Sequence, residues 1–405
     1  MRDATLSRWK TPGVWLLGLL ALGLVLSHKT RLDEPNLYAL QAEAWLQGRM
    51  DVPQGPHDLA LHGGKAWVPF PPFPSVLLLP IVAVTGPERA PVRAVAVLLA
   101  LLAGWSLWRL LTRLELPPPE RAWLAAAFLL GTGFWSCVLW SGGVWFFAHV
   151  VATTCLVLAV TEALGRGRAV LVGLLAGSAF LSRQLAVYSL LFLLVVLWRR
   201  AEESGRRRQV LQVFGGLFGF GLCALAYLAF NAARFEGPFD TGYAYIPLGD
   251  YLQARVEKYG LFHPAYLPFN FITMFLEGPH FIFSAPRQLQ PVAVDGIGTS
   301  LTIASPFLFV ALAARGSGTA VPVRAAWASV LLALTHMLLY YNNGFVQLNA
   351  HRFALDFLPV LMVLVALGAK RLPADRWKPL VAWAVGLNFF VLAVFPYLSR
   401  ALRRL

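Results

Sequence analysis

Long apolar stretches alternate with short polar segments along nearly the whole chain. Most of these stretches approach the ~20 residues that a membrane-spanning helix needs. The apolar stretches cover approximately residues 12–27, 72–86, 91–111, 122–140, 145–164, 169–182, 185–198, 210–230, 299–314, 325–341, 353–369 and 379–398. The pattern predicts an all-α fold, a polytopic integral membrane helix bundle.

The segment 72–86 differs from the other apolar stretches because prolines interrupt it. Pro72, Pro74 and Pro80 lie within it, and it is only about fifteen residues long, shorter than a span requires. We therefore expect an interfacial or re-entrant helix here, which leaves about eleven transmembrane helices. The basic N-terminus followed by an apolar run resembles a signal peptide, but it lacks a small-x-small cleavage site, so we interpret it as a retained first helix.

Composition agrees with a membrane protein. Hydrophobic residues make up 58% of the 405 residues and charged residues only 13%, whereas soluble domains carry about 25% charged residues. A soluble globule cannot bury this much apolar surface. The cysteines Cys137, Cys155 and Cys223 lie inside apolar stretches, which favours packing roles over a disulfide framework, a metal site or a thiol nucleophile.

The net charge of +14 is spread over short clusters between the apolar stretches, which argues against a single nucleic-acid-binding face. Short cytoplasmic loops of membrane proteins carry an excess of Lys and Arg. If the N-terminus is cytoplasmic and 72–86 does not cross, every short basic loop falls on the cytoplasmic side. The C-terminal arginines, from Arg400 onward, then lie outside, against the rule. We expect a single domain over 1–405, with two long extracytoplasmic loops at 28–90 and 232–298.

The first of these loops is rich in ionisable residues, and one of its segments has the pattern of a short helix. Residues 35–47 predict an amphipathic helix lying on the membrane, with Leu37, Tyr38, Trp45 and Leu46 facing lipid or the bundle. Extracytoplasmic surface helices of this kind are thus part of the expected architecture.

Asp33 and Glu34 follow the first apolar stretch directly, and Pro35 suits the first position of the next helix. A carboxylate at the membrane surface and close to a helix N-terminus can accept a proton from an acceptor hydroxyl. An equally simple interpretation is that one of the two residues caps the helix.

The acidic pair opens a series of motifs in a fixed order. The series continues through Tyr38, then Gly48, Arg49, Met50, Asp51, Val52, Pro53, then Gly63, Gly64, Lys65, Ala66, Trp67, and ends with Pro69, Phe70, Pro71, Pro72. In this order the chain resembles the polyprenyl-phosphate-dependent glycosyltransferases of the GT-C superfamily, in particular the lipid A aminoarabinose transferase and protein O-mannosyltransferase branch. The resemblance is best over the first ninety residues and extends to the helix layout throughout.

The resemblance implies roles for several of these residues. The catalytic base of the superfamily maps onto Asp33, with Glu34 adjacent. The superfamily's lysine before the paired prolines is Phe70 here, so Lys65 becomes the candidate for donor phosphate binding. Some distant members hold a metal ion with a second acidic motif, and at that place this chain has Ser141, Gly142 and Gly143 without a carboxylate. No cofactor is required by the scheme, and a divalent metal is possible but not supported.

Three further residues are candidate donor-phosphate ligands. Arg183 stands between two apolar stretches without an acidic neighbour, where it can bind a phosphate or snorkel to lipid headgroups. Arg352 and His351 lie in a polar cluster before a late helix. Arg352 and Asp356 are also spaced to pair across one helical turn, and a lone histidine is more often structural.

The second long loop is aromatic. Tyr243, Glu277 and His280, together with Tyr38 of the first loop, are the candidate substrate-loop residues. In the superfamily this loop closes over donor and acceptor. Aromatic rings suit sugar faces, but they suit the bilayer interface equally well.

The function predicted from the resemblance is a membrane glycosyltransferase. It would move a hexosyl or pentosyl group from a polyprenyl-phosphate donor to an acceptor hydroxyl on a glycan, lipid or protein, with inversion. The active site would face the extracytoplasmic side of a bacterial inner membrane. The alternatives are a transporter or lipid flippase, or an inactive GT-C-like scaffold. Transporters usually place charges at the bilayer midplane in two related halves, a symmetry that this sequence does not show.

Overall fold

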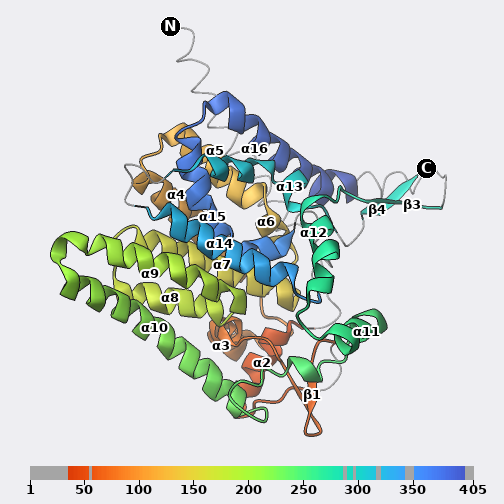
Figure 1. The fold of residues 1–405 in the computed structure, drawn as a ribbon. Helices are drawn as coiled ribbons and strands as arrows, with labels where there is room; N and C mark the ends of the chain where they lie inside the picture. The colour runs from red at the N-terminus through yellow and green to blue at the C-terminus, as the bar shows by residue number, and fades with distance from the viewer. Residues whose placement is uncertain are drawn as a thin grey trace. The chain divides into compact units, whose positions relative to one another are not determined.

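The computed structural model describes residues 35–53, 57–285, 290–294, 298–315, 321–342 and 351–396. This part of the chain is mostly helical, with two small two-stranded sheets (Figure 1). The chain divides into two compact units. Unit 1 comprises Met1–His28, Gly104–Leu139 and Tyr259–Leu405, and unit 2 comprises Lys29–Ala103 and Trp140–Lys258. Each unit is described by itself.

Unit 2 contains the first loop and most of the early helices. Its elements are α2 (Leu37–Leu46), β1 (Ala60–His62), β2 (Lys65–Trp67), α3 (Phe73–Thr85), the first half of α4 (Val92–Arg113), α7 (Val144–Ala163), α8 (Ala169–Phe180), η1 (Gln184–Tyr188), α9 (Ser189–Arg200), η2 (Glu202–Ser204), α10 (Arg206–Ala232), η3 (Tyr243–Tyr245) and nearly all of α11 (Asp250–Tyr259). The helix α7 is its core, because it is buried on almost all sides and contacts α3, α8 and α9.

The pair α8 and α10 packs at very close range, side by side in Figure 1. A Cβ atom added at Gly173 of α8 would collide with the backbone carbonyl of Gly216 in α10, and one added at Gly219 would collide with that of Val170. Only glycine allows two helix backbones to approach this closely, the arrangement typical of helix pairs in membranes. The opposite face of α10 carries exposed Phe214, Phe218 and Leu222, as expected for a lipid-facing surface.

Unit 1 contains the later helices. Its elements are the second half of α4, α5 (Pro118–Leu130), α6 (Gly133–Leu139), η4 (Pro264–Tyr266), α12 (Leu267–Phe275), β3 (Phe281–Phe283), β4 (Pro291–Val294), α13 (Leu301–Ala304), η5 (Pro306–Ala313), α14 (Val323–Leu338), η6 (Arg352–Asp356), α15 (Leu358–Ala369), α16 (Ala374–Phe389) and the π-helix η7 (Phe390–Val394). All twelve residues of α15 are buried, and this helix forms the core of the unit.

Two helices of unit 1 expected to be continuous are broken. The stretch 122–140 is divided into α5 and α6, which are bent by 54°. The stretch 299–314 holds one α-helical turn, α13, and then the 3-10 helix η5 after Ser305. Pro306 explains this second break, because proline removes a helix hydrogen bond and clashes with the preceding turn. The hydroxyl of Ser305 donates to the carbonyl of Gly131 at 2.6 Å, so the two breaks meet.

Within the described residues, four helices are long and apolar enough to cross a membrane: Val92–Arg113, Val144–Ala163, Arg206–Ala232 and Ala374–Val394. The bent pair of α5 and α6 would be a fifth. Shorter apolar helices include α3, whose 13 residues reach only about 20 Å of a ~30 Å hydrocarbon core. That length favours the interfacial or re-entrant interpretation of 72–86. The number of about eleven spans stays a prediction, since 12–27 lies outside the described residues.

The predicted surface helix is present, but its environment differs from the expectation. Seven of the ten residues of α2 are buried, including Leu37 and Tyr38, and only its last residue, Leu46, is exposed. The amphipathic interpretation was wrong because Ala39, Ala42 and Ala44, which carry little periodic signal, form a second packing face. The helix contacts α3, and the Ser75 hydroxyl donates to the Gln41 amide oxygen at 2.7 Å.

Candidate active site

The start of α2 positions the first predicted motif. Its N-cap is Asn36, whose side-chain oxygen accepts from the amide of Tyr38 at 2.9 Å. The Asn36 amide nitrogen donates to the Gly142 carbonyl at 2.8 Å, which ties the helix to the turn before α7. Asn36 thus occupies the N-cap position suggested for the acidic pair, and Pro35 precedes that cap instead of entering the helix. Asp33 and Glu34 themselves lie outside the described residues.

Tyr38 is fully buried one turn into α2. Its ring lies 6.4 Å from that of Phe70 and 6.3 Å from that of Phe147, and Phe70 in turn meets the Tyr243 ring edge-on at 6.1 Å. Burial raises the pKa of Tyr38 well above its ordinary value, and nearby Tyr243 adds to the rise. The Tyr38 hydroxyl therefore stays protonated at neutral pH and is able to donate a hydrogen bond. Two predicted substrate-loop residues, one from each long loop, are brought together here.

Arg183 is the cation of this cluster. It precedes η1 in extended conformation, after α8, and its charge opposes the rise in the pKa of Tyr38. The adjacent Gln184 donates to the Tyr227 hydroxyl at 2.7 Å. We call Tyr38, Arg183 and Tyr243 the tyrosine–arginine cluster. Tyr38 is buried and the other two are partly buried, so the cluster is a set of donors with a positive charge in a partly shielded place, an arrangement that stabilises an anion.

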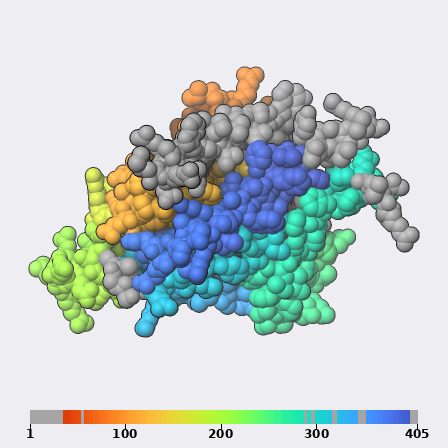
Figure 2. All heavy atoms as spheres, turned by 90° about the horizontal axis from the view of Figure 1, so that it is seen from above, coloured from red at the N-terminus to blue at the C-terminus, as the bar shows by residue number. Residues whose placement is uncertain are grey.

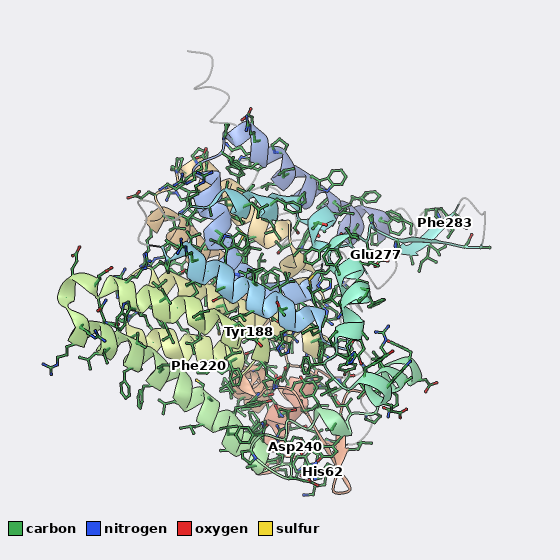
Figure 3. All side chains as sticks on the ribbon, in the orientation of Figure 1. His62, Tyr188, Phe220, Asp240, Glu277 and Phe283 are labelled. Carbon is green, nitrogen blue, oxygen red and sulfur yellow. The ribbon has the colours of Figure 1, made fainter. Side chains whose placement is uncertain are left out.

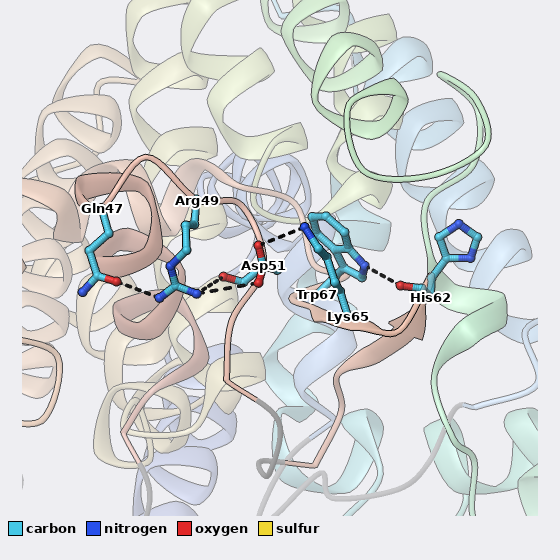
Figure 4. A network of polar contacts seen from close by, with 6 residues as sticks. All are labelled: Gln47, Arg49, Asp51, His62, Lys65 and Trp67. Atoms are coloured by element: carbon cyan, nitrogen blue, oxygen red, sulfur yellow. Dashed lines mark hydrogen bonds and ion pairs between the residues drawn. The ribbon is translucent and has the colours of Figure 1, made fainter.

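Lys65 lies in a separate polar network at the hairpin of β1 and β2 (Figure 4). The hairpin turns at Gly63 and Gly64, both of which adopt the positive φ that a tight two-residue turn requires. The Lys65 ammonium is 3.7 Å from one Asp51 oxygen, and the Arg49 guanidinium is 3.6 Å from the other. Asp51 thus holds two half-exposed cations next to each other, and the sequence interpretation missed it.

A second loop segment packs on this hairpin. The His62 ring lies 4.4 Å from that of Tyr245, and the Tyr245 hydroxyl donates to Asp240 at 2.8 Å. Figure 3 shows His62 and Asp240 at the same end of unit 2. The hydrogen bond to Asp240 raises the pKa of Tyr245 to about 12. A small apolar core of Ala60, Trp67 and Phe235 lies beneath these groups.

In unit 1, Arg352 and His351 are both buried at the start of η6. The Arg352 guanidinium stacks on the Phe353 ring at 4.7 Å. Arg352 and Asp356 are the first and last residues of η6, a 3-10 helix with three residues per turn instead of the α-helical turn that the spacing argument assumed. Their pairing stays a prediction. Asp356 is buried, and its charge interacts electrostatically with His336 of α14.

Glu277 and His280 follow α12 in unit 1 and are 3.3 Å apart, carboxylate oxygen to imidazole nitrogen. Tyr38 and Tyr243 belong to unit 2, so the four predicted substrate-loop residues are divided between separately described units. Within the described part of the chain, no three His, Cys, Asp or Glu side chains gather as a metal site. Because this part leaves out Asp33 and Glu34, the expectation for a metal stays a prediction.

Comparison with known proteins identifies the class of fold. No protein-family model matches the sequence, and no curated protein matches it significantly. Two solved structures share the fold of this chain, and together with its mostly helical, apolar architecture they confirm the predicted fold class, an all-α helix bundle of a membrane protein.

The particular similarity is to ArnT from Cupriavidus metallidurans. Its apo structure matches over 96% of this chain and 72% of that chain, with a TM-score of 0.51 and 15% identity. A second ArnT structure, bound to undecaprenyl phosphate, matches over 96% and 73% with a TM-score of 0.50 and 14% identity. At this identity the likeness concerns the fold.

Proposed function

We propose that this protein is a membrane glycosyltransferase that uses a polyprenyl-phosphate-linked sugar. The observation that carries the proposal is the fold shared with ArnT, a lipid-linked sugar transferase, over nearly the whole chain. One of the two similar structures holds undecaprenyl phosphate, which makes a polyprenyl phosphate the natural lipid to test. A bacterial inner membrane is the corresponding location, with the site on the extracytoplasmic face.

The proposed reaction displaces a phosphate from the anomeric carbon. Asp33 removes the proton from an acceptor hydroxyl, whose oxygen then attacks the anomeric carbon from the side opposite the phosphate. The new glycosidic bond forms as the bond to the phosphate oxygen breaks, so the configuration inverts and polyprenyl phosphate is released. The leaving phosphate gains charge in this step, and groups that stabilise this charge lower the barrier.

The tyrosine–arginine cluster supports the placement of that phosphate in unit 2. Arg183 supplies a guanidinium that can donate two parallel hydrogen bonds to phosphate oxygens. Tyr38 and Tyr243 add hydroxyl donors, and the raised pKa of Tyr38 keeps its hydroxyl protonated. Lys65, Arg352 and His351 stay candidate ligands, although Lys65 already has a carboxylate partner in Asp51.

Lipid binding tests the first half of the proposal. Undecaprenyl phosphate and undecaprenol are compared in lipid nanodiscs by native mass spectrometry or by the shift in unfolding temperature. We expect binding of the phosphate and little binding of the alcohol. Arg183→Gln should weaken phosphate binding by about tenfold or more, the equivalent of ~1.4 kcal/mol, whereas Arg207→Gln at an exposed site is the matched control. Equal binding of both lipids would contradict the proposal.

Transfer tests the second half. Lipid-linked sugars extracted from bacterial membranes are offered with labelled acceptor fractions, and labelled product is followed over time. Asp33→Asn should retain lipid binding and lose about 10²–10⁴-fold in rate, the usual contribution of a general base. A wild-type protein that binds undecaprenyl phosphate and moves it across the bilayer without sugar transfer would instead be a flippase.

A further inference from the structure

The hairpin of β3 and β4 in unit 1 exposes a set of apolar side chains. Phe281, Ile282 and Phe283 of β3 are exposed by 37%, 46% and 48%. Successive strand residues point to opposite faces, so both faces of the hairpin are apolar. The strands pair from Phe281 opposite Val294 to Phe283 opposite Pro291.

An isolated two-stranded sheet of this kind is marginal in water. Exposed apolar strand edges also promote aggregation, and proteins usually protect them with charges or cover them. All seven residues of the two strands are apolar. The hairpin therefore requires an apolar surface against it.

The position of the hairpin points to lipid as that surface. The Phe281 ring lies 5.1 Å from that of Phe395 and 6.4 Å from that of Phe390, at the end of the candidate span Ala374–Val394. The same span exposes Trp383 and Phe390, and α16 lies at the surface, deep blue in Figure 2. The apolar surface of the hairpin is thus continuous with that of a helix suited to face lipid.

We propose that the β3–β4 hairpin is a lipid-contacting element that inserts Phe281, Ile282 and Phe283 into the bilayer interface next to the end of α16. Its depth is limited by the backbone. Helices and closed barrels are the structures that span the hydrocarbon core, and an open two-stranded sheet is not one of them. The hairpin therefore lies in the headgroup and upper acyl region, within about 5–10 Å of the boundary.

Nitroxide labelling of single cysteine variants tests this placement in the full-length protein. Phe283→Cys and Ile282→Cys probe the two faces, so one position remains usable where the other disturbs folding, which thermal unfolding monitors. Glu257→Cys in α11 is the exposed polar control, and Leu222→Cys on the exposed face of α10 is the deep control. The unsubstituted protein supplies the background from its own cysteines. Collision with oxygen and with a nickel chelate is measured in phosphatidylcholine nanodiscs.

We expect the hairpin labels to favour oxygen over nickel, with a depth between those of the two controls. Nickel accessibility equal to that at Glu257 would overturn the proposal, and so would a depth equal to that of Leu222. Protection from both reagents would show that protein covers the hairpin, and dipolar broadening in that case would identify a second copy. Either result would also overturn the lipid assignment.

Discussion

The Arg234 guanidinium donates a 2.6 Å hydrogen bond to the carbonyl of Val68, 166 residues earlier in the chain. It also donates to the Phe230 carbonyl and the Asn231 side-chain oxygen, both at 3.2 Å, and stacks on the Phe230 ring at 3.6 Å. Burial lowers the pKa of Arg234 to about 10, so it remains charged at neutral pH. Arg234 is thus one of the side chains that join the two long loops, beside the ring contacts of Phe70 with Tyr243 and of His62 with Tyr245.

Arg234→Gln should lower the free energy of unfolding by about 2 kcal/mol, because hydrogen bonds from a charged donor contribute roughly 1.5–3 kcal/mol each and part of this is offset by relief of the buried charge. Denaturant unfolding in detergent measures the change. Arg207→Gln, at an exposed position, should stay within about 0.5 kcal/mol of the parent. Equal effects of the two variants on the free energy of unfolding would show that the contact between Arg234 and Val68 does not stabilise the fold.

The glycines between α8 and α10 give a second test. Gly173→Ala should destabilise the protein by about 1–3 kcal/mol, since the added methyl group must force two packed backbones apart. Gly221→Ala in α10 is a matched control, because a Cβ there meets nothing within 4 Å. Alanine also favours the helix over glycine, so the control should unfold at an equal or higher temperature. If Gly173→Ala left the stability unchanged, α8 and α10 would not pack as closely as described.

The Asp51 network separates a binding role of Lys65 from a structural one. If Lys65 contacts the donor phosphate, Lys65→Met weakens undecaprenyl phosphate binding by about tenfold, or ~1.4 kcal/mol. Asp51→Asn removes a competing anion and should leave that affinity unchanged or raise it. An exposed ion pair contributes only about 0–1 kcal/mol to stability, so unfolding temperatures should barely change. Unchanged affinity in Lys65→Met would remove this residue from the phosphate site.

Asp58 supplies a pH-dependent prediction. Burial raises the pKa of Asp58, and its ion pair with the largely exposed His57, 3.5 Å away, opposes the rise only in part. The folded state therefore prefers the protonated carboxyl, and this contribution to stability is complete in acid and is lost as the pH rises through the raised pKa. Asp58→Asn should raise the unfolding temperature at pH ~7, and the difference should shrink toward pH ~3.5. If the difference in unfolding temperature between Asp58→Asn and the parent grew toward acid, the pKa of Asp58 would not be raised in the folded state.

The sequence predicted the long helices well because their signal is local. The stretches 145–164 and 210–230 are apolar over about twenty residues, and α7 and α10 occupy them. The breaks were harder to predict, since Gly131 and Thr132 resemble ordinary residues of an apolar helix. Whether such a helix bends depends on a partner elsewhere in the chain, here the Ser305 hydroxyl.

The candidate site was predictable in part for the same reason. Arg183 was noticeable as a charge in apolar surroundings, and Tyr38 belonged to a motif in fixed order. Arg234 looked like an ordinary loop residue beside Glu236, and its role depends on Val68, which no local pattern indicates. Asp51 belongs to one of the ordered motifs, but the sequence does not indicate its two cationic partners. Arg49 and Lys65 come close to Asp51 only in the folded hairpin.

The hydrogen bond from Ser305 to the Gly131 carbonyl has a consequence for biogenesis. A helix broken in an apolar environment leaves carbonyl groups that need a donor, and the donor for Gly131 is encoded 174 residues later. At a synthesis rate of 5–20 residues per second, the early break waits roughly 10–35 s for its partner. During this interval the Gly131 carbonyl lacks its Ser305 donor. We therefore expect the junction of α5 and α6 to reach its final packing only after the segment that contains Ser305 has been synthesised.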